Sequence, residues 1–193
     1  MGLDMYLERI HRNADGYRNV NLDDFDVNSK LYKTLAPYFH QRGSEFYSWT
    51  SLFEEVGYWR KANAIHKWFV ENVQNGEDDC GQYEVSKEQL EELLDVCKEV
   101  LDKVVMAPSK IANLIMGRRV TKNGCEDIPE DKMTVLNPEV CEELLPTQCG
   151  FFFGSTNYDE FYIDDIKETV SILTKVLEET NFDEYKIYYS SSW

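Results

Sequence analysis

Residues 57–70 constrain the fold of this 193-residue chain more than any other stretch. Read as one helix, with about 100° between successive residues, the stretch places Trp59 and His66 on one apolar face. Ile65 and Trp68 fall nearly opposite, so the helix is apolar on two sides. A helix of this kind has to be covered on both sides, and we predict that it lies between two layers of the fold.

Polar side chains interrupt this apolar background. His66 lies within the main apolar face and Asn63 lies at its margin, while Arg60 and Lys67 flank Asn63. A buried polar group left unpaired costs about 1–3 kcal/mol, so His66 and Asn63 need partners. Either protein groups supply these partners, as they do for most buried polar groups, or His66 and Asn63 form the floor of a ligand pocket. In the second case Arg60 or Lys61 would stand at its rim.

Strand-like patterns occur at both ends of the chain and in its last third. Residues 2–8 alternate apolar and polar side chains, and residues 185–190 are rich in β-forming types. Phenylalanines between two glycines predict a buried central strand over residues 149–155. We therefore predict an α+β fold, in which a small, mostly antiparallel sheet of these strands packs with about four to five helices. Residues 1–193 are expected to form one domain, with an insertion-like connection at 106–146.

The helix that begins after Ser86 is the best specified element of the chain. Ser86 and Gln89 form a capping box, and Val85 and Leu90 occupy the staple positions. An apolar stripe then continues to Val104. Further helical segments are predicted over residues 30–40, 109–119, 138–145 and 163–180.

A second group of polar side chains flanks the predicted strand at 149–155. Gln148 precedes it, and Ser155 and Tyr158 follow it. Polar groups at the end of a buried strand can contact a ligand. Residues 155–159 also hold candidates for the N-cap of the next helix, Asp159 among them. We expect at least one of them to cap that helix, and pocket roles stay open for Gln148, Ser155 and Tyr158.

The charge of the chain limits its partners. It carries 36 acidic and 20 basic residues, a formal net charge of −16, so direct nucleic-acid binding is not expected. The same charge can imitate a nucleic acid and attract a basic host protein. The first residues are acidic where a signal peptide is basic, and no apolar run reaches the ~20 residues that span a bilayer, so no membrane contact is expected. Five cysteines without C-x-x-C spacing indicate neither a zinc site nor a disulfide framework and fit a reducing cytoplasm.

Three segments stand out as motifs: Gly-Leu-Asp-Met-Tyr-Leu at residues 2–7, Tyr-Trp-Arg-Lys-Ala-Asn-Ala-Ile-His-Lys-Trp-Phe at 58–69, and Pro-Thr-Gln followed by Phe-Phe-Phe-Gly-Ser-Thr within 146–156. Together with neighbouring segments, they resemble a family of uncharacterised bacteriophage and prophage proteins. The resemblance extends over about two thirds of the chain. It brings no activity with it, but it implies a phage context, in which a protein that interferes with host defence is expected.

Common enzyme templates are absent from the sequence. It contains no G-x-x-x-x-G-K-[ST], G-x-G-x-x-G, H-E-x-x-H or G-x-S-x-G motif. Binding of a nucleotide-like ligand needs cations for phosphate, an aromatic ring for stacking and amides for base edges. The residues that supply these groups, and that we predict to bind the ligand, are Tyr58, Trp59, Arg60, Lys61, Asn63, His66, Gln148, Ser155 and Tyr158.

We therefore expect a protein of the host cytoplasm that binds, and sequesters, a phosphorylated nucleotide-like molecule. No catalytic residue, metal or cofactor is predicted. The alternative hypothesis is an acidic protein that imitates DNA and inhibits a basic host protein. A third hypothesis is hydrolysis of the bound ligand.

Overall fold

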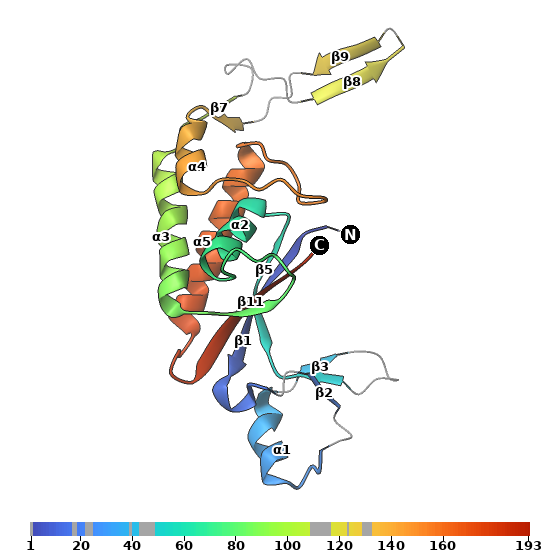
Figure 1. The fold of residues 1–193 in the computed structure, drawn as a ribbon, viewed down its shortest axis with the longest axis vertical. Helices are drawn as coiled ribbons and strands as arrows, with labels where there is room; N and C mark the ends of the chain where they lie inside the picture. The colour runs from blue at the N-terminus through green and yellow to red at the C-terminus, as the bar shows by residue number, and fades with distance from the viewer. Residues whose placement is uncertain are drawn as a thin grey trace.

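The structure, a computed structural model, has the α+β fold that the sequence predicts (Figure 1). It describes residues 2–16, 19–21, 25–38, 40–42, 49–108, 117–122, 124–128 and 133–193. A four-stranded antiparallel sheet lies at its centre, with the strand order β5-β1-β11-β6. These strands are β1 (Asp4–His11), β5 (Glu54–Arg60), β6 (Gln82–Val85) and β11 (Tyr185–Ser192).

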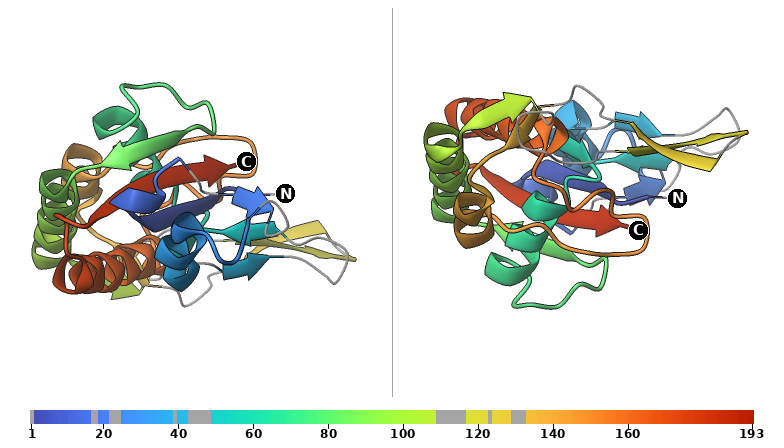
Figure 2. Two further views of the ribbon diagram at one scale, coloured as in Figure 1. Left: turned by 90° about the horizontal axis from the view of Figure 1, so that it is seen from below. Right: turned by 90° about the horizontal axis from the view of Figure 1, so that it is seen from above.

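Helices α2 (Asn63–Asn72), α3 (Lys87–Lys103) and α5 (Glu160–Glu179) cover one face of this sheet. Figure 2 shows α3 and α5 side by side along it. Met5, Leu7 and Tyr189 point from the sheet into this layer and are fully buried. Phe69 of α2 stacks on the Tyr189 ring, with 3.9 Å between the ring centroids. Trp68, on another side of α2, is buried as well, so this helix is covered on both sides, as predicted.

Both long helices begin at the capping residues that the sequence indicates. The Ser86 hydroxyl accepts a hydrogen bond from the Gln89 amide, and the Gln89 side chain accepts one from the Ser86 amide. This is the predicted capping box of α3. Asp159 caps α5 by accepting from the amides of Phe161 and Tyr162.

Smaller elements extend from the two ends of this core. At one end a second cluster of buried side chains forms, in which Ala14, Leu35, Leu52 and Phe53 pack with Ile10 of β1. The elements at this end are η1 (Arg12–Ala14), β2 (Asn19–Asn21), α1 (Lys30–Leu35), η3 (Ala36–Tyr38), β3 (His40–Arg42) and β4 (Trp49–Ser51). At the other end lie β7 (Met106–Pro108), β8 (Gly117–Thr121), β9 (Gly124–Ile128), β10 (Met133–Val135) and α4 (Pro138–Leu144) (Figure 1).

The prediction of one helix over residues 57–70 is wrong in its first part. Trp59 lies on β5, opposite Met5 of β1. Lys61 has a φ of 63° and forms the turn before α2. Helical periodicity therefore holds only from residue 62 onward, because pairing with β1 determines the conformation before it. Trp59 is buried as expected, but a strand places it there.

The predicted strand at 149–155 is also wrong. This segment is a loop: Phe151 is 81% exposed, Phe152 has a φ of 69°, and of the three phenylalanines only Phe153 is buried. Gly154, with a φ of 96°, prevents a regular strand as well. The third strand beside β1 and β11 is β5 instead.

Two other predictions concern residues 106–146. Of the helix predicted over 109–119, residues 109–116 lie outside the described part, and residues 117–119 belong to β8. The helical turn predicted at 138–145 is confirmed as α4.

Among the described residues, no helix is both long and apolar enough to cross a membrane.

Close packing of α5 on β5 depends on Gly57. A Cβ added there would lie 2.7 Å from Ile172 Cγ2 and 3.2 Å from Leu7 Cβ. We expect Gly57→Ala to lower the free energy of unfolding by about 1–3 kcal/mol, because α5 has to move away. Urea unfolding measures this loss, with Gly2→Ala as the control, since a Cβ at Gly2 meets Lys61 Cε at 3.4 Å. A loss at Gly57 no larger than at Gly2 would contradict the tight contact.

Candidate functional site

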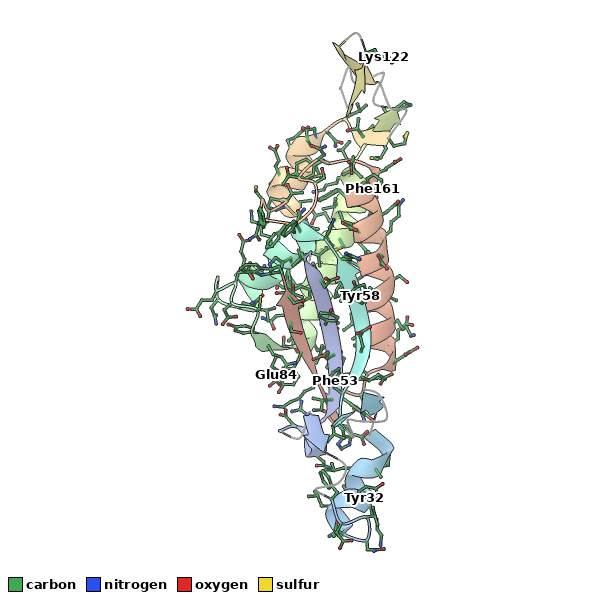
Figure 3. All side chains as sticks on the ribbon, turned by 90° about the vertical axis from the view of Figure 1, so that its right-hand side faces the viewer. Tyr32, Phe53, Tyr58, Glu84, Lys122 and Phe161 are labelled. Atoms are coloured by element: carbon green, nitrogen blue, oxygen red, sulfur yellow. The ribbon has the colours of Figure 1, made fainter. Side chains whose placement is uncertain are left out.

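A cavity of about 340 Å³ lies where three segments meet. These segments are the turn from β5 into α2, the loop at residues 147–157, and the first two turns of α5. Residues 60–65 line one side, Thr147, Gly154, Ser155 and Asn157 line the loop side, and Asp159, Phe161, Tyr162, Asp165 and Ile166 line the third side. Phe161, at the start of α5, is labelled in Figure 3.

The turn at Lys61 shapes the first side. The Lys61 amide donates to Leu3 O at 2.8 Å, which holds the turn against the beginning of the chain. Gly154 approaches this turn so closely that a Cβ there would lie 3.1 Å from Lys61 Cβ. Helix α2 then begins with Ala62 at its N-cap and no side-chain capping bond. The positive end of the α2 dipole therefore lies at the cavity without a side chain to cap it.

Charges of both signs border the cavity. Arg60 is 61% exposed, and its Nε lies 3.8 Å from Asp4 Oδ1. Lys61 stands next to it on the cavity wall. On the opposite side, the Asp159 carboxylate is occupied by the amides of α5. Asp165, one turn and a half further along α5, is the second acidic group of the lining.

Burial raises the pKa of the Asp165 carboxyl to about 7, and the negative charges of Glu168, Asp164 and Asp159 add to the increase. Near neutral pH this group is therefore in part a neutral carboxylic acid, which can donate a hydrogen bond into the cavity. Thr169, one helical turn later, links the backbone of Asp165 to the core. The Thr169 hydroxyl donates to Asp165 O at 2.7 Å and accepts from Trp59 Nε1 at 2.9 Å.

This pKa has a consequence for stability. Because the folded-state pKa of Asp165 is above the ordinary 3.8, its contribution to stability is complete below that value and is lost as pH rises through about 7. Asp165→Asn should therefore stabilise the protein more at pH ~8 than at pH ~5, by about 1–2 kcal/mol after allowance for partial solvent screening. Urea unfolding of both proteins at the two pH values measures the difference. An equal effect at both would show that Asp165 titrates normally.

Asn63 holds the loop side of the cavity in place. Its Nδ2 donates to Phe153 O at 3.2 Å and to Ser155 O at 2.8 Å, and its Oδ1 accepts from the Gln148 amide at 3.1 Å. The side chain is buried and all of these bonds go to backbone groups of one loop. Asn63 is therefore a positioning residue for Ser155 and its neighbours.

His66 is fully buried and lies behind the loop. Its Nε2 is 3.0 Å from Asp78 Oδ2 and its Nδ1 is 2.8 Å from the Tyr189 hydroxyl. Because a carboxylate only accepts, Nε2 carries the proton of this pair, and in the neutral ring Nδ1 accepts from Tyr189. Asp78 also accepts from Trp193 Nε1 at 3.0 Å. Both ring nitrogens thus have protein partners.

Four of the nine residues predicted to bind a ligand line the cavity, namely Arg60, Lys61, Asn63 and Ser155. The other five lie elsewhere. Trp59 and His66 are in the core, and the Tyr58 hydroxyl donates to Asp4 on the other face of the sheet. Gln148 meets Asn63 through its backbone amide, and the Tyr158 hydroxyl accepts from the Thr147 amide.

The main residue that sequence reasoning missed is Asp165. Its signal was its helical position, three residues after Tyr162 and four before Thr169, both of which are buried. An acidic residue on a buried helix face needs an explanation. Thr147 and Asn157 gave no comparable signal, because a loop determines their position.

Comparison of the chain with protein-family models, with curated proteins and with solved structures gave no match. The functional interpretation therefore rests on the geometry of the cavity.

Proposed function

We propose that this protein binds a small phosphorylated molecule in the cavity at the start of α2. The observation that carries the proposal is the coincidence of an uncapped helix N-terminus with Arg60 and Lys61 at one cavity of about 340 Å³. Helix N-termini bind phosphate through their free amides and their dipole. Ligand pockets usually start at about 300 Å³, so a mononucleotide-sized molecule is a suitable occupant.

The acidic side of the cavity determines the orientation of the ligand. A phosphate is expected against Arg60 and the first turn of α2. A hydrogen-bond acceptor, such as a ring nitrogen or carbonyl of a base, is expected against the protonated carboxyl of Asp165. Ser155 and Asn157 supply further polar contacts between the two ends. The net charge of −16 opposes capture of an anion by the protein as a whole. In this arrangement only the α2 end of the site has to attract the phosphate.

Binding without turnover is the simpler function for this lining. Among the described residues that line the cavity there is no histidine and no cysteine, so the usual nucleophile–base pairs are lacking there. A resemblance to phage proteins supports sequestration of a host signalling nucleotide as the biological purpose. The proposal is thus a binding protein that removes its ligand from solution.

Isothermal titration with a panel of linear and cyclic nucleotides tests this function. We expect one class to bind, and the double variant Arg60→Gln/Lys61→Gln to weaken its affinity by about 10–100-fold, since each charge-assisted bond contributes about 1.5–3 kcal/mol and exposure reduces it. The control, Lys87→Gln/Lys103→Gln, removes the same charge from α3, outside the cavity.

Two results would overturn the proposal: absence of heat with every nucleotide, or equal weakening by the cavity and control variants. Mass spectrometry of small molecules released from protein purified from its host gives the same answer without a chosen panel.

The Asp165 contact adds a pH dependence to ligand binding. Affinity should fall as pH rises above about 7, and Asp165→Asn should remove that fall.

A further inference from the structure

Two polar side chains of the cavity have no partner among the described residues. Asp165 lines the α5 side and Asn157 lines the loop side. No hydrogen bond or ion pair of the described part reaches the Asp165 carboxyl or the Asn157 side-chain amide. The bond from Asn157 to Ser155 Oγ comes from the backbone amide, and the bond to Asp165 O goes to the backbone carbonyl. Both side chains are therefore available to a ligand.

Each of these side chains presents a hydrogen-bond donor beside an acceptor. The Asn157 amide carries an NH2 group next to a carbonyl oxygen. A protonated Asp165 carboxyl carries an O–H group next to a carbonyl oxygen. The cavity thus holds two groups with the same donor–acceptor pattern, one on the loop and one on a helix.

The charges around Asp165 maintain this pattern near neutral pH. Its neighbours on α5 are acidic, and among the described lining residues the cations stand at the turn into α2, on the other side of the cavity. These charged groups are Asp159, Asp164 and Glu168 on α5, and Arg60 and Lys61 at the turn. Partial burial together with negative neighbours favours the uncharged carboxyl, which is the form that donates.

We propose that the site recognises adenine, and that the base of the bound nucleotide lies between Asn157 and Asp165. This inference rests on the proposed function and names the base of its ligand. Adenine has an acceptor beside a donor on two edges, because its amino group lies between N1 and N7. Each edge can pair with one of the two side chains. Guanine presents two acceptors on its N7 edge, and cytosine and uracil have no second edge of this kind.

The spacing of the two side chains suits a base. Asn157 lies two residues before the N-cap Asp159, and Asp165 lies six residues after it. At ~1.5 Å per residue, Asp165 is ~9 Å along the axis of α5 from this cap. Tyr162 and Ile166 line the cavity on the same helix, so apolar surface is present for the ring. Adenine in this place leaves the α2 end of the cavity to the phosphate.

Isothermal titration with AMP, GMP, CMP and UMP tests the inference. We expect AMP to bind about tenfold or more tightly than the other three, because a buried polar group left unpaired by the wrong base is costly. Two analogues examine the edges separately. IMP replaces the amino group by a carbonyl oxygen, and 7-deaza-AMP lacks N7. Each should bind about tenfold more weakly than AMP.

Variants of the two side chains identify where the base is read. Asn157→Ala/Asp165→Ala should weaken AMP about 10–100-fold and leave the affinity for ribose 5-phosphate within about twofold. Asp165→Asn retains a donor beside an acceptor, so it should keep most of the affinity for AMP. The control, Asn28→Ala/Asp95→Ala, makes the same two changes at exposed positions outside the cavity lining. Circular dichroism checks the fold of each variant.

Several results would overturn the inference while the proposed function stands. They are equal affinity for the four nucleotides, ribose 5-phosphate binding as tightly as AMP, or unchanged AMP affinity in Asn157→Ala/Asp165→Ala. Adenosine separates the two in the other direction. If adenosine bound as tightly as AMP and both alanine changes weakened it, adenine recognition would stand and the role of the phosphate would fall. Absence of binding by AMP and adenosine would exclude adenine as the ligand.

Discussion

Replacement of His66 by alanine is expected to lower the free energy of unfolding by about 3–5 kcal/mol. The ring is fully buried and stands edge-on to the Phe153 ring, with 5.3 Å between their centroids. Its loss leaves a cavity in the core. It also leaves the Tyr189 hydroxyl without its partner at 2.8 Å and the Asp78 carboxylate without its partner at 3.0 Å. Urea unfolding followed by tryptophan fluorescence measures the loss.

An isosteric variant separates the two contributions. His66→Phe keeps most of the ring volume and removes only the hydrogen bonds, so it should lose about 1–3 kcal/mol, less than His66→Ala. Tyr189→Phe removes one of those bonds from the other side. If His66→Phe were as stable as the unmodified protein, the Asp78–His66–Tyr189 chain would contribute nothing, and packing alone would explain the position of the histidine.

The role of His66 shows how far a helical pattern could predict this fold. Polarity and burial of His66 and Asn63 followed from their positions in an apolar stripe, and so did their need for partners. The partners themselves did not follow. Asp78 comes from a loop after α2, and Tyr189 comes from a strand more than a hundred residues later. Spacing along one helix carries no information on contacts of that range.

Local patterns predicted the elements whose own residues determine them. The capping box at Ser86 appears as expected because it is complete within four residues. Among the N-cap candidates in residues 155–159, Asp159 is the one that caps α5. The strand at Trp59 and the loop at Phe151 depend instead on tertiary contacts. Pairing with β1 makes residues 54–60 a strand, and bonds from Asn63 hold residues 148–155 in a loop.

The candidate cavity was predictable in part for the same reason. Arg60, Lys61 and Asn63 are sequence neighbours, and they stay together around the turn into α2. Asp165 enters from α5 and Thr147 from a loop, so only the packing of α5 against α2 brings them to the same space. That packing also gives the cavity its second, acidic side, which no local motif suggested.

Asn63 is the residue on which the loop side of the cavity depends. Asn63→Ala is expected to destabilise the fold by about 2–4 kcal/mol, because Phe153 O, Ser155 O and the Gln148 amide lose a buried partner together. Thermal unfolding measures the loss. Hydrogen exchange of the Gln148 amide should become faster, since that amide donates to Asn63 Oδ1.

Asn63→Asp is the matched variant, because it keeps shape and the acceptor for the Gln148 amide while replacing the donor that serves two carbonyl oxygens. It should therefore retain protection of the Gln148 amide and still lose about 1–3 kcal/mol of stability through the unpaired Phe153 and Ser155 carbonyls. The two variants also separate framework from ligand contact. If Asn63 only positions the loop, ligand affinity in both variants should fall in proportion to the loss of loop protection. A variant that kept the loop protected and yet lost all affinity would instead make Asn63 a direct ligand contact.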